Sequence, residues 1–135
     1  MMYLEQLNEQ ISKGILLGDK IFCEIDIDCV LDGRDDDYFD SAWIDAHNSF
    51  KEIQFEINER KLIDIIREVS FKATYNHCRD SDLAAYVSDD FELISKALLT
   101  NFSNPFINAL WECYKNHKIP FGKIKPLAGN ITEVL

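Results

Sequence analysis

Two stretches of the chain alternate between apolar and polar residues with a period of two. In KIFCEIDIDCVLD (residues 20–32), one face carries the apolar set Ile21, Cys23, Ile25, Ile27, Cys29 and Leu31. In FKEIQFEI (residues 50–57), the apolar residues Ile53, Phe55 and Ile57 alternate with Glu52, Gln54 and Glu56. Successive side chains of a β-strand point to opposite faces, so this pattern is typical of a half-buried strand. The sequence therefore predicts two strands, with Asp32-Gly33 as a turn after the first.

Other segments repeat their apolar residues at helical spacing. Asn58 is predicted to cap a helix, and Asp89 with Glu92 resembles a capping box that opens another. Asn104-Pro105 places a proline at the first helical position of a further segment, a position that proline favours. Together these signals predict five helices, over residues 2–13, 38–48, 58–75, 89–100 and 105–116.

The order of these elements predicts an α+β fold, in which a small antiparallel sheet carries helices packed on one face. A short third strand is expected at residues 84–87, and the tail from Phe121 onward is expected to be a loop or an edge strand. A mainly α-helical bundle is the alternative. The length of 135 residues is typical of one domain, and the chain has no internal repeat or linker, so residues 1–135 are expected to form a single domain.

The charge of the chain is concentrated near its front. The formal net charge is −10, and residues 24–45 contain nine acids and one base, Arg34. Nucleic acids and anionic membranes are poor partners for such a surface, because they are bound by lysine and arginine. A basic protein or a metal ion would be attracted instead. The net charge of −8 on these residues alone reaches the upper end of what solubility requires of a whole small domain, roughly 2–8 in magnitude.

The sequence also contains signals about the compartment. No apolar run approaches the roughly 20 residues that a membrane span needs, and the N-terminus has no secretory signal pattern. The four cysteines show no CxxC spacing, and Cys23 and Cys29 are expected to be small buried apolar groups. These features predict a cytoplasmic protein.

The sequence motifs give little support for a metal site or an enzyme active site. An EF-hand loop starting at Asp28 would place Gly33 at position six, but Val30 and Phe39 then occupy ligand positions three and twelve. Cys113 and His117 lie four apart on a predicted helix, yet His77-Cys78 is an awkward second pair of zinc ligands. Phosphate-binding and hydrolase motifs are absent. We therefore predict no catalytic residue, metal or cofactor, with a metal-dependent enzyme built on the clustered carboxylates kept as an alternative.

The concentrated negative charge is best explained by the hypothesis that the protein binds a cationic partner. Carboxylates raise the rate of encounter with a basic surface, and exposed aromatic residues then stabilise the complex. A small acidic protein can occlude the basic cleft of a nuclease or imitate its substrate. The charge map predicts a partner-binding surface with one aromatic residue, made of Glu24, Asp26, Asp28, Asp35, Asp36, Asp37, Tyr38 and Asp40. A second acidic cluster comprises Asp80, Asp82, Asp89 and Asp90.

The stretch YVSDDFELISKAL at Tyr86–Leu98 resembles segments of small bacterial immunity proteins, as found in contact-dependent growth inhibition and related polymorphic toxin systems. Size and acidity agree with that resemblance. It implies that the protein neutralises a cognate toxin, often a nuclease, by stoichiometric binding. Because these families share no single fold, the resemblance assigns no contact residues. An adaptor subunit without a toxin is the remaining alternative.

Overall fold

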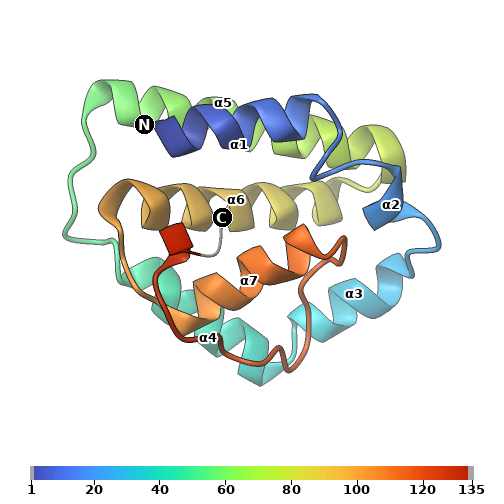
Figure 1. Cartoon of the computed structure of the whole chain (residues 1–135). Coiled ribbons are helices and arrows are strands. Elements are labelled where there is room, and N and C mark those ends of the chain that lie inside the picture. The colour runs from blue at the N-terminus through green and yellow to red at the C-terminus, as the bar shows by residue number, and fades with distance from the viewer. Residues whose placement is uncertain (1, 134–135) are drawn as a thin grey trace.

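The part of the chain that the structure describes is built from seven α-helices and a short 3-10 helix. The structure, a computed structural model, describes residues 2–133. Within that range the elements are α1 (Met2–Ser12), α2 (Asp19–Phe22), α3 (Ile27–Arg34), α4 (Asp37–Asn48), α5 (Ile57–Cys78), α6 (Ser81–Thr100), α7 (Pro105–Lys115) and η1 (Ile131–Glu133). Figure 1 shows α1 and α5 side by side in one layer, α6 in the middle, and α3, α4 and α7 in the layer beyond it.

The long helix α6 lies at the centre of this arrangement. Its buried residues Leu83, Val87, Phe91 and Ile94 recur every three or four positions, and the burial extends around much of the helix because neighbours cover both sides. The connection from α5 is short because Arg79 takes a left-handed conformation (φ 57°) and Asp80 caps the start of α6. One continuous hydrophobic core contains residues from all seven helices.

The predicted α+β fold is wrong: the described residues form no strand and no sheet, and the architecture is all-α. The alternating stretch at residues 20–32 forms the end of α2, a link, and α3. Asp26 accepts a hydrogen bond from the Cys29 backbone N–H (3.1 Å) and so starts a helix where the pattern predicted a strand. Cys23 and Cys29 are exposed rather than buried, because the apolar contact is made by Ile21, Phe22 and Val30. Over such short runs, alternation alone cannot distinguish a strand from short helices.

The second predicted strand, at residues 50–57, is a turn and an extended link with no strand beside it. Phe50 is buried, but Ile53 and Ile57 are exposed, so this stretch has no consistent inner face. The following helix begins earlier than the predicted cap at Asn58, because Glu56 and Glu59 form a reciprocal capping box at its start.

The third expected strand, at residues 84–87, lies inside α6, and the predicted capping box of Asp89 and Glu92 lies in the middle of that helix. By contrast, the helix predicted over residues 38–48 is confirmed as α4. The predicted Asn104-Pro105 start of α7 is also confirmed, with the Asn104 side chain accepting hydrogen bonds from two backbone N–H groups.

Candidate partner-binding face

The predicted acidic residues occupy α3, its two ends and the first turns of α4. Asp26 is the N-cap of α3, and Asp36 is the N-cap of α4, where it accepts a hydrogen bond from the Tyr38 N–H (3.2 Å). Asp28 lies in the first turn of α3, and Asp37 and Asp40 lie in the first turn of α4. Negative charge at a helix N-terminus is favourable. Local helix formation therefore accounts for part of the charge that the sequence concentrates here.

Other carboxylates of this region have no such local benefit. Asp32 is exposed in the last turn of α3, where the helix dipole disfavours negative charge, and it lies one helical turn from Asp28. Asp35 is exposed at the C-terminal end of the same helix. Glu24 is exposed in the link before α3, with a left-handed φ of 61°.

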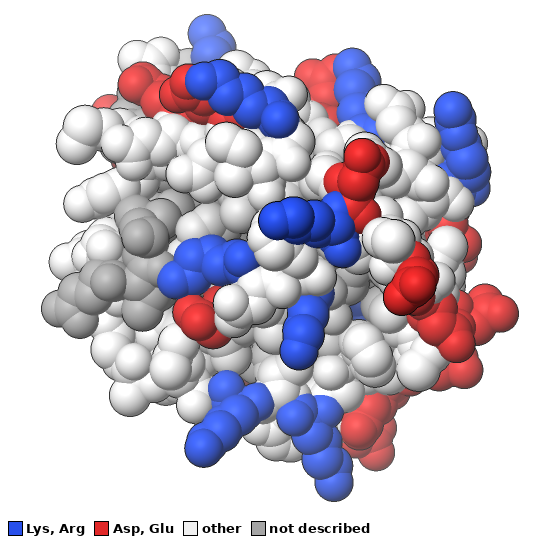
Figure 2. Space-filling model, turned by 45° about the vertical axis from the view of Figure 1, so that its right-hand side comes forward, with Lys and Arg blue, Asp and Glu red and all other residues white. Residues whose placement is uncertain are grey.

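Part of the acidic set surrounds an open hollow beside α3. Its lining comprises four carboxylates together with Phe121 and Gly122 of the segment after α7; the carboxylates are Asp26, Asp28, Asp32 and Asp36. Figure 2 shows acidic side chains gathered at the lower right, the side of the molecule on which α3 lies, with Lys and Arg side chains over the middle and bottom of the view. The hollow is therefore a locally negative surface next to an exposed aromatic side chain.

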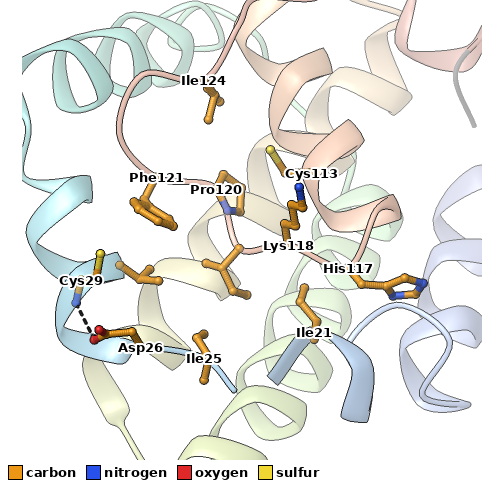
Figure 3. A pocket seen from close by; sticks show the side chains of 12 residues that line it. Ile21, Ile25, Asp26, Cys29, Cys113, His117, Lys118, Pro120, Phe121 and Ile124 are labelled. Atoms are coloured by element: carbon orange, nitrogen blue, oxygen red, sulfur yellow. Dashed lines mark hydrogen bonds between the residues drawn. The ribbon is translucent and has the colours of Figure 1, made fainter. Parts of the chain in front are cut away.

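An apolar groove of about 350 Å³ adjoins this hollow. The groove runs between α2 and α3 on one side and the end of α7 and the following segment on the other (Figure 3). Asp26, Cys29 and Phe121 line both the groove and the hollow. The remaining apolar lining is aliphatic and includes Ile21, Ile25, Val30, Ile119 and Ile124.

The segment after α7 is held against α3 by three contacts. The Gly122 N–H donates to the Gly33 carbonyl (3.0 Å), and Arg34 Nη1 donates to the Pro120 carbonyl (3.1 Å). The Phe121 ring lies so close to Gly33 that a Cβ at that position would overlap it. The absence of a side chain at Gly33 thus allows the aromatic ring to sit on α3 with 38% of its surface exposed.

Tyr38 contributes to the same region. Its side chain is 41% exposed, and its hydroxyl donates to the Ile124 carbonyl (3.4 Å). This contact links the start of α4 to the segment after α7. Tyr38 therefore lies at the surface, and its role as an aromatic contact residue stays a prediction.

A buried carboxylate, Asp90 of α6, organises the helices beneath this face. It accepts two hydrogen bonds from Arg34 (2.7 and 2.8 Å), one from Trp43 Nε1 (2.9 Å) and one from the Tyr114 hydroxyl (2.6 Å). Arg34 is 4% exposed and Asp90 is fully buried. One carboxylate therefore joins α3, α4 and α7 to the central helix.

The surroundings of Arg34 and Tyr114 keep both of these side chains protonated. Burial alone would lower the pKa of Arg34, but the charge of Asp90 and its hydrogen bonds outweigh that effect and raise it. Burial, together with the negative charge of Asp90, raises the pKa of the Tyr114 hydroxyl, which stays protonated and donates. The Arg34 guanidinium also lies 4.7 Å from the Phe39 ring centroid and 4.9 Å from that of Tyr86.

A comparison with protein families matches most of the chain. The family model described as immunity protein PIM1 matches residues 6–121. The chain belongs to the PIM1 immunity protein family. The matched range includes the Arg34–Asp90 pair and Phe121. It also includes the acidic face, by which we mean the exposed and partly exposed carboxylates from Glu24 to Asp40. A comparison with curated proteins finds no match. The resemblance to immunity proteins inferred from the sequence is thus confirmed, and a cognate toxin is the partner that membership of this family implies.

The predicted contact residues of this PIM1 family member do not all face one hollow. Asp35 and Asp40 instead line a separate pocket of about 190 Å³ with Trp43, Tyr86 and Asp89. Asp37 and Glu24 line neither of the two. The acidic face therefore has two parts, one beside the segment after α7 and one between α3, α4 and α6.

The second acidic cluster predicted from the sequence is not a surface cluster. Asp80 caps α6 through the Leu83 N–H (2.9 Å), and Asp82 is exposed in the first turn of that helix. Asp89 pairs with Arg67 (3.1 Å), whereas Asp90 is buried. Sequence reasoning missed Asp90 as a core residue, although it lies seven positions after Leu83 and four before Ile94, in phase with the buried stripe.

The possible zinc ligands lie apart in the fold. Cys113 and His117 both line the apolar groove, whereas His77 stacks on Phe22 and contacts Asp19 (3.0 Å). Among residues 2–133, no group of three or more His, Cys, Asp or Glu side chains is arranged to hold a metal ion. In the same residues, no helix is long and apolar enough to cross a membrane.

Proposed function

We propose that this PIM1 family member neutralises its cognate toxin by binding it stoichiometrically through the acidic face of α3 and the start of α4, without any chemical step. The observation that supports the proposal is the location of the acidic hollow beside an apolar groove and two exposed aromatic residues, Tyr38 and Phe121. Carboxylates beside exposed aromatic residues form a combination suited to a basic protein partner.

The chemistry of the face also indicates the kind of toxin. A toxin with a basic contact surface is complementary to it, and a nuclease is the obvious candidate because its cleft must attract phosphate groups. Covering that cleft would exclude the nucleic acid substrate. The proposal places neutralisation in the cytoplasm of the cell that makes the toxin, in a contact-dependent or other polymorphic toxin system.

The test uses a toxin whose lethality the chain suppresses when both are expressed in one cell. The triple variant Asp35→Asn, Asp36→Asn and Asp37→Asn removes three charges and retains a side-chain oxygen at the α4 cap. The matched control neutralises three exposed acids of α1 and α5, in the layer on the other side of α6, through Glu5→Gln, Asp64→Asn and Glu68→Gln. Association and dissociation rates with the purified toxin are measured at low and high salt.

We expect the acidic-face variant to associate roughly tenfold more slowly than the control variant at low salt, because electrostatic steering acts on encounter. The difference should shrink in high salt, where the Debye length falls from about 10 Å at 0.1 M to about 3 Å at 1 M. Equal association rates for the two variants would show that this face does not steer the toxin. A chain that suppresses no toxin would remove the proposed function altogether.

A further inference from the structure

We infer that the apolar groove between α3 and the segment after α7 receives an apolar side chain of the toxin, and that a basic residue next to it in the toxin lies over the acidic hollow. This inference rests on the proposed function and specifies the chemistry of the toxin segment that is recognised. It adds Cys29, Phe121 and Ile124 to the contact surface, none of which the charge pattern could identify.

The groove is a formed site with a fixed wall. The segment carrying Phe121 and Ile124 is tied to α3 by the hydrogen bonds at Gly33 and Pro120, and to α4 by Tyr38. Its volume of about 350 Å³ lies at the lower end of the roughly 300–1,000 Å³ seen for ligand pockets. Such a size suits a side chain from a partner protein. Little reorganisation is needed on binding, which lowers the entropic cost.

The charges around the groove distinguish its two ends. Asp26 lies at the end that is continuous with the acidic hollow, whereas Lys118 lies away from that end, beside Cys113, and His117 lies farther along the groove (Figure 3). A toxin segment with its basic residue toward Asp26 would be attracted, and the reverse orientation would bring that residue to Lys118. The groove therefore selects both the composition and the direction of the segment.

The same charges argue against other occupants. A second copy of this chain carries the same net charge of −10, and its acidic face would be repelled by the hollow. A lipid surface with anionic headgroups would be repelled for the same reason. A basic protein segment with an apolar side chain is the occupant that satisfies both the hollow and the groove.

The first test fills the groove without changing any charge. Cys29→Trp places a large side chain at an exposed helical position that lines the groove, and Cys23→Trp makes the same change at an exposed position that does not line it. With the toxin defined above, we expect Cys29→Trp to weaken binding by at least about tenfold, and Cys23→Trp to leave it within about twofold. Melting curves of both variants establish that each is folded.

The second test removes a groove contact. Phe121→Ala is compared with Tyr75→Ala on α5, because both aromatic side chains are 38% exposed and only Phe121 lines the groove. We expect Phe121→Ala to hasten dissociation by at least about tenfold and Tyr75→Ala to leave it unchanged. Asp28→Asn in the acidic hollow should weaken binding, whereas Lys118→Gln in the groove should not.

The outcomes separate this inference from the proposed function. If the triple variant at Asp35–Asp37 slows association while Cys29→Trp and Phe121→Ala bind as the unaltered chain does, the acidic face binds the toxin and the groove inference is overturned. If the groove variants bind weakly and the triple variant associates normally, the groove is a contact but the steering role is wrong. If Lys118→Gln weakens binding as much as Asp28→Asn, the inferred direction of the segment is wrong.

Discussion

Removing the charge of Asp90 should destabilise the protein far more than the same change at its neighbour Asp89. Asp90→Asn preserves the size of the side chain but leaves the Arg34 guanidinium buried without its counter-ion. It also turns one acceptor oxygen into an N–H₂ group, which would face donors from Arg34, Trp43 or Tyr114. Breaking a buried ion pair from one side costs about 3–5 kcal/mol, a large share of the roughly 5–15 kcal/mol by which domains are stable.

Asp89→Asn provides a closely matched control on the same helix. The Asp89–Arg67 pair is partly exposed, with side-chain exposures of 39% and 42%. Pairs of this kind contribute about 0–1 kcal/mol. Burial raises the pKa of Asp89 despite the neighbouring Arg67, so its charge contributes still less to folding. We therefore expect the free energy of unfolding to change by less than about 1 kcal/mol in this variant.

Urea unfolding followed by circular dichroism measures both variants. With a slope of about 2 kcal/mol per molar urea, the Asp90→Asn midpoint should fall by roughly 1.5–2.5 M, while the Asp89→Asn midpoint should move by less than about 0.5 M. When Arg34→Met is added to Asp90→Asn, the double variant should regain part of the lost stability, because the second substitution removes the unpaired buried charge. Equal midpoints for Asp90→Asn and Asp89→Asn, or additive losses in the double variant, would refute the assigned role of the Arg34–Asp90 pair.

Two further predictions concern the groove region. Gly33→Ala should lower the free energy of unfolding by about 1–3 kcal/mol, even though alanine favours helices, because its Cβ would overlap the Phe121 ring. Asp32→Ala on the same helix is the control. A Gly33→Ala variant that is more stable than the unaltered chain would contradict the contact. Burial and the charge of Asp90 raise the pKa of the Cys113 thiol, so its thiolate fraction at pH 8 should be small. Cys113 should therefore react with iodoacetamide several times more slowly than exposed Cys23, as followed by mass spectrometry of the peptides; equal rates would contradict that burial.

The sequence predicted helices well where caps and spacing agreed, and it failed where a short alternating run stood alone. Asn104-Pro105 identified the start of α7 correctly because cap, proline and apolar stripe all indicate the same position. The strand prediction for residues 20–32 was wrong because their alternation extends over two short helices. In the sequence, an N-cap carboxylate at Asp26 cannot be distinguished from a carboxylate on the outer face of a strand. The second predicted strand then had no partner with which to pair.

Of the candidate site, the sequence could predict only the part that is marked by charge. The acidic residues of α3 and α4 are identifiable from composition, and most are exposed as expected. The groove could not be foreseen, because one wall comes from α2 and α3 and the other from the segment after α7, about 90 residues later in the chain. Phe121 appears in the sequence as one aromatic residue in a tail, and only its contact with Gly33 places it beside the acids.

The buried ion pair explains how so strong a negative surface persists in a folded protein. Arg34 is the one base among residues 24–45, and it points inward to Asp90 instead of neutralising any of the nine acids around it. None of those nine is buried, and this segment has no Lys or Arg at the surface among them. Repulsion among them would favour the separation of α3 and α4 from the core. The four hydrogen bonds to Asp90 oppose that separation from beneath, so they hold the acidic surface in place, as the proposed capture of a basic toxin would require.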